Sequence, residues 1–138
     1  MSRPLVYIAH PLGRGPDREE NRKRASRWVA WAAEQGVAPV APWITLSGEW
    51  SEDRREEGLE IDLAVVERCD ELWAVGPRIS PGMSLEVAHA RFRHIPVRDL
   101  TKCDEAHAAM WVRQFVRARK TSTTPSELEI RDLADVIR

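Results

Sequence analysis

Leu5-Val6-Tyr7-Ile8-Ala9 is a continuous run of β-forming apolar residues, and it ends in a loop rich in proline and glycine, His10-Pro11-Leu12-Gly13-Arg14-Gly15-Pro16. Such a run is typical of a strand buried on both faces, and the prolines and glycines predict a loop after it. Helical periodicity begins at Asp17, the expected N-cap, and Gly36 is expected just after the helix. A second strand follows at residues 37–42, and its two prolines place it at an edge of a sheet.

The rest of the chain repeats this alternation of strands and helices. We expect an irregular loop with two tryptophans at residues 43–56 and a helix from about Gly58. A strand at 71–76, a helix from about Met83 to Arg93 and a strand at 95–98 follow. This order predicts an α/β fold: a Rossmann-like, flavodoxin-like parallel sheet of four to five strands with helices on both faces, plus C-terminal helices.

We assign residues 1–103 to this domain and residues 104–138 to a C-terminal helical extension, packed on the domain or at a dimer interface. Its first helix has an apolar stripe formed by Ala106, Ala109, Met110, Val112, Phe115 and Val116. A capping-box pattern at residues 124–127 predicts a last helix that runs to Val136.

Composition excludes several classes of function. The chain has 138 residues with 21 Lys plus Arg against 22 Asp plus Glu, so no global positive charge attracts it to nucleic acid polymers or membranes. Cys69 and Cys103 show no CxxC pattern or histidine at metal-ligand spacing, so we expect no disulfide framework, metal or cofactor. The apolar run at residues 5–9 is too short for a signal peptide or membrane span, which predicts a cytoplasmic protein.

Glycine-rich and polar segments follow the predicted strands, where parallel sheets bind their ligands. The loop Gly13-Arg14-Gly15 offers backbone N–H groups, a cation and a helix N-terminus, which suit a phosphate. Glycines in a turn also serve simply for their positive φ. Ser80 and Ser84 stand where another helix begins, and they either cap that helix or hold an oxyanion.

Two carboxyl groups are candidates for acid–base or nucleophilic chemistry. Glu86 is expected in the first turn of its helix, where the helix dipole favours the ionised form that a nucleophile needs. Asp62 interrupts an apolar helical stretch, so it either points to solvent or is buried with a raised pKa, as a general acid requires. Asp70 is interpreted as structural, receiving backbone N–H groups before its strand.

Aromatic residues and one histidine complete the set of candidates. Tyr7 lies in the middle of the first strand, where a buried hydroxyl needs a partner. His10 is the histidine nearest the predicted cleft. Trp43 and Trp50 are expected to overhang that cleft, where they either stack on a base or form a dimer contact.

Four segments in the same order resemble the nucleoside 2-deoxyribosyltransferase-like superfamily, and within it the small uncharacterised domains of the DUF4406 type. These segments are Val6-Tyr7-Ile8-Ala9-His10-Pro11, Ala41-Pro42, Asp62 eight residues before Asp70, and Ile79-Ser80-Pro81-Gly82-Met83 followed by Glu86. The resemblance covers about residues 4–100.

The resemblance implies roles for three residues. Glu86 would attack the anomeric carbon and form a glycosyl-enzyme intermediate, Asp62 would handle the proton on the leaving base, and Tyr7 would orient the Glu86 carboxylate. Cleavage with retention uses two carboxyl groups about 5 Å apart, whose environments set different pKa values. Because relatives are commonly oligomers with shared sites, a homodimer or higher homo-oligomer is expected.

One departure from the superfamily concerns the substrate. The transferases carry an aspartate six residues before the nucleophile, and Ser80 stands there in this chain. A serine resembles instead the nucleoside 5′-monophosphate N-glycosidases, in which it holds the phosphate together with the loop after the first strand. The candidate substrate-binding residues are His10, Gly13, Arg14, Gly15, Trp43, Ser80, Gly82, Met83 and Ser84.

The function implied is hydrolysis of the N-glycosidic bond of a nucleoside or 2′-deoxynucleoside 5′-monophosphate. One alternative is a nucleoside 2-deoxyribosyltransferase that exchanges bases. Another is a nucleotide-binding or sensor module without turnover. In each case the partner is a small nucleotide or nucleoside.

Overall fold

The protein folds around a parallel sheet of four strands, which the computed structural model shows within the residues that it describes, 2–120. The strands are β1 (Leu5–Ala9), β2 (Ala38–Val40), β3 (Glu71–Ala74) and β4 (Val97–Asp99), in the order β2-β1-β3-β4. Each neighbouring pair is parallel, and β2 is at an edge. The strand order reverses between β1 and β3, and ligands bind at such a point in open α/β sheets.

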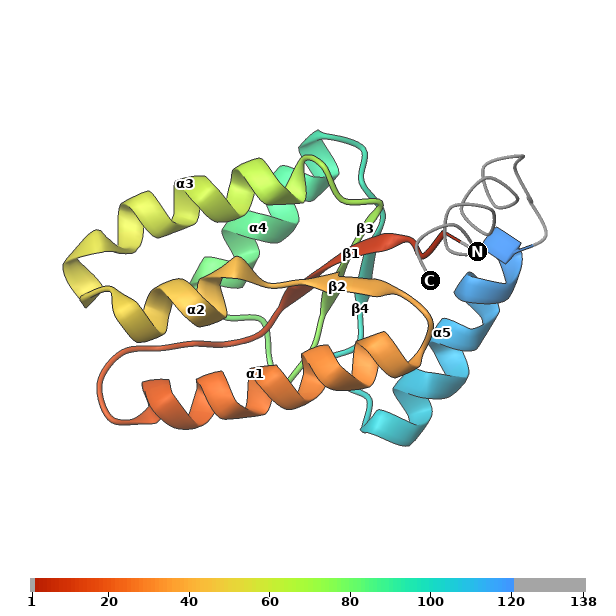
Figure 1. Cartoon of the computed structure of the whole chain (residues 1–138), viewed down its shortest axis with the longest axis horizontal. Coiled ribbons are helices and arrows are strands. Elements are labelled where there is room, and N and C mark those ends of the chain that lie inside the picture. Colours follow the sequence, from red (N-terminus) through yellow and green to blue (C-terminus); the bar gives the residue numbers. More distant parts are fainter. Residues whose placement is uncertain (1, 121–138) are drawn as a thin grey trace, which may run out of the picture.

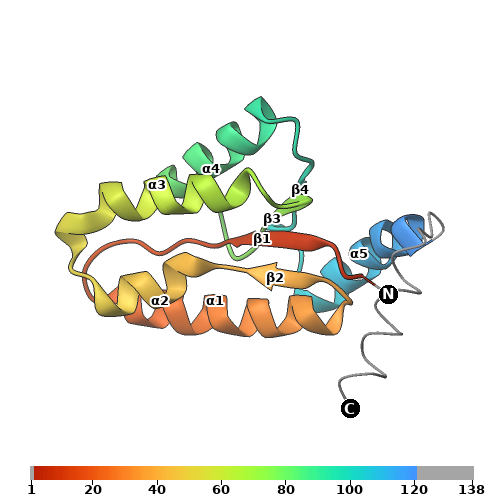
Figure 2. The ribbon, with the colours of Figure 1, turned by 45° about the horizontal axis from the view of Figure 1, so that its top comes forward.

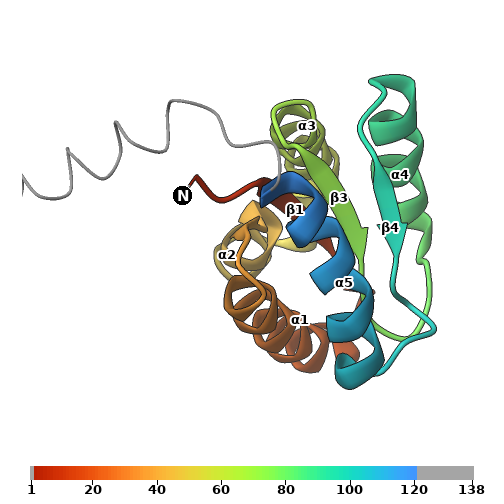
Figure 3. The same ribbon diagram turned by 90° about the vertical axis from the view of Figure 1, so that its right-hand side faces the viewer.

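Helices cover both faces of the sheet, which confirms the predicted α/β architecture (Figures 1 and 2). They are α1 (Asp17–Glu34), α2 (Pro42–Glu49), the short 3₁₀ helix η1 (Glu52–Arg54), α3 (Arg55–Val66), α4 (Pro81–Phe92) and α5 (Glu105–Lys120). Figure 3 shows α1 and α5 on one side of the sheet and α4 on the other. No helix among residues 2–120 is long and apolar enough to cross a membrane.

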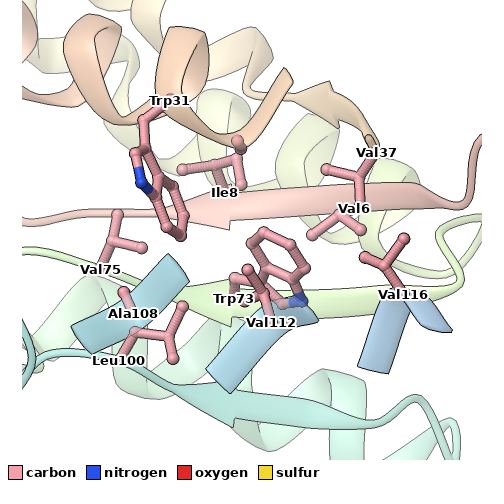
Figure 4. Packing of buried hydrophobic residues seen from close by; sticks show 11 residues of the cluster. Val6, Ile8, Trp31, Val37, Trp73, Val75, Leu100, Ala108, Val112 and Val116 are labelled. Carbon is pink, nitrogen blue, oxygen red and sulfur yellow. The ribbon is translucent and has the colours of Figure 1, made fainter. Parts of the chain in front are cut away.

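Alternation along β1 divides its side chains between the two layers. Val6 and Ile8 face α1 and α5, where they pack with Trp31, Trp73 and Val112 (Figure 4). Tyr7 and Ala9 face the opposite layer and pack with residues of α3 and α4. The sequence alternation of β1 therefore places the only tyrosine of the chain beneath these two helices.

The helix α5 contributes residues to the core, although its buried face differs from the predicted stripe. Ala108, Val112 and Val116 are buried, and their four-residue spacing keeps them on one face. Met110, predicted to belong to the apolar stripe, is 63% exposed because it lies on another face of the helix, and the neighbouring Trp111 is 58% exposed. The division at residue 103 stays a prediction, and the last predicted helix lies outside the described residues.

The prediction of an irregular loop at residues 43–56 is wrong, since this segment forms α2, η1 and the start of α3. Pro42 occupies the first turn of α2, where its fixed φ favours a helix. The segment lacks a clean apolar period because only Trp43 of α2 is buried.

Two other helix starts also differ from the prediction. Asp17 is the first residue of α1 rather than its N-cap, which is Pro16. The helix α4 begins at Pro81 rather than Met83, because proline at the first position suits a helix start. Gly36 follows α1 with a φ of +94°, as predicted for the residue after a helix.

Candidate active site

A cavity of about 770 Å³ opens beyond the carboxyl ends of β1 and β3. Its volume is within the range of small-molecule sites. Of the predicted site residues, those that line it are His10, Gly13, Arg14, Trp43, Asp62, Ser80, Gly82, Met83 and Glu86. Tyr7 lies behind the wall, while Gly15 and Ser84 do not line the cavity.

Glu86 and Tyr7 form a buried hydrogen-bonded pair at the base of the cavity. Glu86 lies on α4 and is 7% exposed, and the fully buried Tyr7 hydroxyl donates a hydrogen bond to Glu86 Oε2. Burial and the neighbouring carboxyl groups raise the pKa of Tyr7 well above its usual value, so its hydroxyl keeps its proton. Tyr7 thus acts as a fixed donor that restricts the orientation of the Glu86 carboxyl group.

Asp62 reaches the same place from α3. It is 7% exposed, so the alternative that it points to solvent is wrong. The Tyr7 hydroxyl interacts with the Asp62 carboxyl group as well, whereas Asp62 Oδ1 is buried without a hydrogen-bond partner among the described residues. Burying a polar oxygen without a hydrogen-bond partner costs free energy, so this atom is suited to exchange a proton with a ligand in the cavity.

The ionisation expected for Glu86 from the helix dipole is wrong. Because α4 begins at Pro81, Glu86 lies in the second turn, and the first turn of α4 contains no acidic residue. Burial raises the pKa of Glu86 to about 8 and that of Asp62 to about 7, while the Tyr7 hydrogen bond lowers both. The two groups titrate as a coupled pair, and between pH 7 and 8 the pair holds one proton.

These raised pKa values predict a pH-dependent stability. The folded chain binds protons more tightly at Glu86 than the unfolded chain does, so its stability should fall as the pH rises from 4.5 towards 8. A Glu86→Gln variant should lose less stability over this range than the wild-type protein. Urea unfolding at several pH values measures the difference, and parallel curves for the two proteins would contradict the raised pKa.

The Gly15 N–H in the loop after β1 is not free to bind an anion. Gly13 and Gly15 have φ values of +72° and +74°, which favour glycine. The Gly15 N–H donates to Glu52 Oε1 at 3.2 Å, and Arg18 Nη1 lies 3.2 Å from the same oxygen. The Gly15 hydrogen bond and then Arg18 lower the pKa of Glu52, so its carboxylate stays charged and occupies this position.

The serines at the start of α4 both make hydrogen bonds within this end of the helix. Ser80 is the N-cap, and its Oγ accepts a hydrogen bond from the Met83 N–H at 3.3 Å. Ser84 Oγ donates to the Ser80 carbonyl at 3.2 Å and is exposed outside the cavity. Of the two, only Ser80 combines its capping role with a place in the cavity wall.

His10 and Trp43 are buried residues of the cavity wall. His10 is 4% exposed, its Nδ1 donates to the Pro11 carbonyl at 2.7 Å, and burial lowers its pKa. Its ring lies against Gly76, where a Cβ atom would come within 2.6 Å of His10 Cδ2. Trp43 Nε1 donates to the Ile8 carbonyl at 3.0 Å, so this side chain is fixed and does not overhang the cleft.

Trp50 remains available for contact with a base. It lines the cavity and is partly exposed, and the Arg54 guanidinium lies 3.5 Å from the centre of its ring. Aromatic rings stack readily on bases. Trp50 therefore replaces Trp43 as the aromatic residue with the freedom to stack.

Sequence reasoning missed four arginines that line the cavity: Arg18, Arg54, Arg55 and Arg78. Arg54 and Arg55 escaped because their segment was interpreted as an irregular loop. Arg18 looked like part of the solvated face of α1. For Arg78 a signal was available, since it stands two residues before Ser80 in the loop after β3.

Comparisons with known proteins agree with this fold. A family model described as "Domain of unknown function (DUF7768)" matches residues 4–100. No curated protein matches the chain. The solved 2-deoxyribosyltransferase of the psychrotolerant bacterium Bacillus psychrosaccharolyticus is similar with a TM-score of 0.53 and 19% identity, over 69% of this chain and 70% of that chain.

A second solved structure is the CMP N-glycosidase BcmB of Clostridium botulinum, with a TM-score of 0.45 and 17% identity, over 78% of this chain and 97% of that chain. The likeness to the 2-deoxyribosyltransferase confirms the predicted nucleoside 2-deoxyribosyltransferase-like fold. The assignment to the DUF4406 type stays a prediction.

Proposed function

The chain belongs to the family described as a domain of unknown function, DUF7768, and from the geometry of its cavity we propose that it hydrolyses the N-glycosidic bond of a nucleoside or 2′-deoxynucleoside 5′-monophosphate. One observation carries this proposal. Two buried carboxyl groups, Asp62 and Glu86, line one cavity and share the Tyr7 hydroxyl. Retaining glycosidases place two carboxyl groups on either side of the bond that they cleave.

In the first step, the reactive form of the pair carries its single proton on Asp62, which is the minor of the two singly protonated forms because the pKa of Glu86 is the higher one. In this form the ionised Glu86 carboxylate attacks the anomeric carbon of the sugar. A bond forms between a carboxylate oxygen and this carbon, and the bond to the base nitrogen breaks. The electron pair of the broken bond stays on the base, which takes the proton of Asp62. The products of this step are a neutral base and a glycosyl ester of Glu86.

In the second step, water hydrolyses this ester. The ionised Asp62 takes a proton from the water as its oxygen attacks the anomeric carbon, and the Glu86 carboxylate leaves. The sugar phosphate is released, and Asp62 has regained its proton. The unpartnered Oδ1 of Asp62 supports this exchange, because no described side chain competes for it.

The walls of the cavity suit the two ends of a nucleotide. Arginines on its rim favour an anionic group over a neutral one. Trp50 offers an aromatic face to the base. We therefore place the phosphate near the lining arginines other than Arg54, which lies over the Trp50 ring, and the base near Trp50, with the sugar over Asp62 and Glu86.

The proposal is tested by incubating the protein with a panel of nucleosides and nucleoside 5′-monophosphates, both ribo and deoxyribo, and measuring free base. Release from monophosphates is the expected result. Base exchange that requires a second, added base would identify a transferase instead. If a nucleotide stabilises the protein against heat but no product forms, both the hydrolase and the transferase function are contradicted and a binding module is favoured.

A Tyr7→Phe variant should slow base release by about tenfold to a hundredfold, since it removes one hydrogen bond to a charged group. The loss of this donor also raises the pKa of Glu86 further, so the acidic limb of the pH–rate profile should move to higher pH. The measurement is kcat/KM against pH for both proteins. A variant with an unchanged profile would show that Tyr7 does not tune Glu86.

A further inference from the structure

Five arginines line the cavity, and three of them already have partners. Arg18 contacts Glu52 and the Ser47 carbonyl, Arg54 contacts Glu57 and the ring of Trp50, and Arg55 donates to the Gly13 carbonyl. Arg14 and Arg78 make no hydrogen bond or ion pair with any residue in the described part of the chain. After the Gly15 hydrogen bond and Arg18, the charge of Arg14 also helps to lower the pKa of Glu52, so of these two guanidinium groups Arg78 is the less engaged with a carboxylate.

The two free arginines come from neighbouring places in the fold. Arg14 lies in the loop after β1 and Arg78 in the loop after β3, and these strands pair in parallel up to Ala9 and Ala74. The strand order reverses between them, where a ligand is expected. Arg78 and His10, the residue that follows β1, both line the cavity.

The competing place for an anion is the Gly15 N–H together with Arg18. Glu52 already supplies a carboxylate to both groups, each at 3.2 Å. A phosphate that binds there must displace this carboxylate. Within residues 2–120, no carboxylate occupies Arg78 in this way, and the loop of Arg78 also carries Ser80 in the wall of the cavity.

We propose that Arg78, together with Arg14, binds the anionic group of the substrate, so that the phosphate lies between the loops after β1 and β3 rather than on Gly15 and Arg18. The identification of this group as the phosphate of a nucleotide rests on the proposed function. A guanidinium group can give two parallel N–H bonds to phosphate oxygens. Arg78 then distinguishes a nucleotide from the corresponding nucleoside.

Three variants separate the two possible sites: Arg78→Gln, Glu52→Gln and, as a matched control, Arg91→Gln. Arg78 and Arg91 are both exposed, and Arg91 lies on α4 outside the cavity. The first measurement is the affinity for inorganic phosphate by calorimetry at constant ionic strength. Arg78→Gln should weaken binding by about tenfold or more, as expected for one hydrogen-bonded ion contact.

Under this proposal, Arg91→Gln should change phosphate affinity by less than about twofold, as a screened charge at a distance does. Glu52→Gln should change phosphate affinity much less than Arg78→Gln does, because the Glu52 carboxylate binds Gly15 and Arg18 rather than Arg78. The opposite pattern would overturn it: tighter binding in Glu52→Gln with no effect of Arg78→Gln places the phosphate on Gly15 and Arg18. Equal affinities in Arg78→Gln and Arg91→Gln would also overturn it.

A second measurement separates this inference from the proposed function. In the base-release assay, Arg78→Gln should raise KM for a nucleoside 5′-monophosphate and leave kcat/KM for the nucleoside unchanged. If Arg78→Gln releases base with an unchanged KM for the nucleoside 5′-monophosphate, Arg78 does not bind the phosphate, although the proposed glycosidase function is still supported. Phosphate binding that depends on Arg78, without base release from any substrate, would support the anion site and reject the glycosidase.

Discussion

A Glu86→Gln variant is expected to release base from a nucleoside 5′-monophosphate at least about 10⁴-fold more slowly than the wild-type protein, as found when a covalent nucleophile is removed. Glutamine matches glutamate in size and can still accept the Tyr7 hydrogen bond. Its amide oxygen cannot form the glycosyl ester, so the first step of the reaction is lost. Free base, quantified by chromatography over a long incubation, measures the effect.

The control for this variant is Glu60→Gln on α3, a substitution of the same kind at an exposed residue outside the cavity. It should keep the wild-type rate. Glu86→Gln is not expected to unfold, because it removes a buried carboxyl group whose ionisation is costly. A folded Glu86→Gln protein that keeps more than about a tenth of the wild-type rate would show that Glu86 is not the nucleophile.

The plot of kcat/KM against pH should be bell-shaped with its maximum between about pH 7 and 8. The reason is that the carboxyl pair must hold one proton for the reaction to proceed. Below this range both carboxyl groups are protonated, so Glu86 cannot attack. Above it both are ionised, so no proton remains for the leaving base. The profile of kcat/KM for a nucleotide whose own ionisation is known provides the measurement.

An Asp62→Asn variant should be slower than the wild-type protein by about 10²- to 10⁴-fold, the usual contribution of general acid–base catalysis. Its profile should lose the basic limb, because asparagine has no proton to lose in this range. A substrate with a better leaving base should recover part of the rate of this variant. A maximum near pH 5, or a basic limb that persists in Asp62→Asn, would contradict the assigned roles.

The strands and the carboxyl pair follow from patterns that are local in the sequence. The apolar run at residues 5–9 predicts a buried strand, and its alternation places Tyr7 opposite Val6 and Ile8. Asp62 within an apolar stretch indicates a buried carboxyl group. The predicted structural role of Asp70 is confirmed, since its Oδ2 accepts a hydrogen bond from the Leu5 N–H at 2.7 Å.

Other features depend on contacts between distant segments, so local patterns could not predict them. The Glu52 carboxylate accepts the hydrogen bond of the Gly15 N–H, and Glu52 belongs to the segment predicted to be an irregular loop. The ionisation of Glu86 is set by burial under the neighbouring helix rather than by its place along its own helix. Trp43 is fixed by the carbonyl of Ile8 on β1, a contact that only the folded chain creates.

The oligomeric state and the cellular location also stay predictions. Leu85 and Phe92 on α4 are 53% and 76% exposed, and Leu85 lines the cavity. Such exposed apolar side chains are compatible with the predicted homodimer or higher homo-oligomer. The cytoplasmic location is likewise a prediction.

The most direct measurement is the configuration of the sugar product when the wild-type protein acts on a β-nucleotide in water that contains methanol. Attack by Glu86 inverts the anomeric carbon, and attack by methanol on the glycosyl ester inverts it again. The methyl glycoside should therefore have the β configuration, together with an equivalent of free base. A methyl α-glycoside would contradict a covalent intermediate on Glu86, and the absence of free base from every β-nucleotide would contradict N-glycosidic cleavage itself.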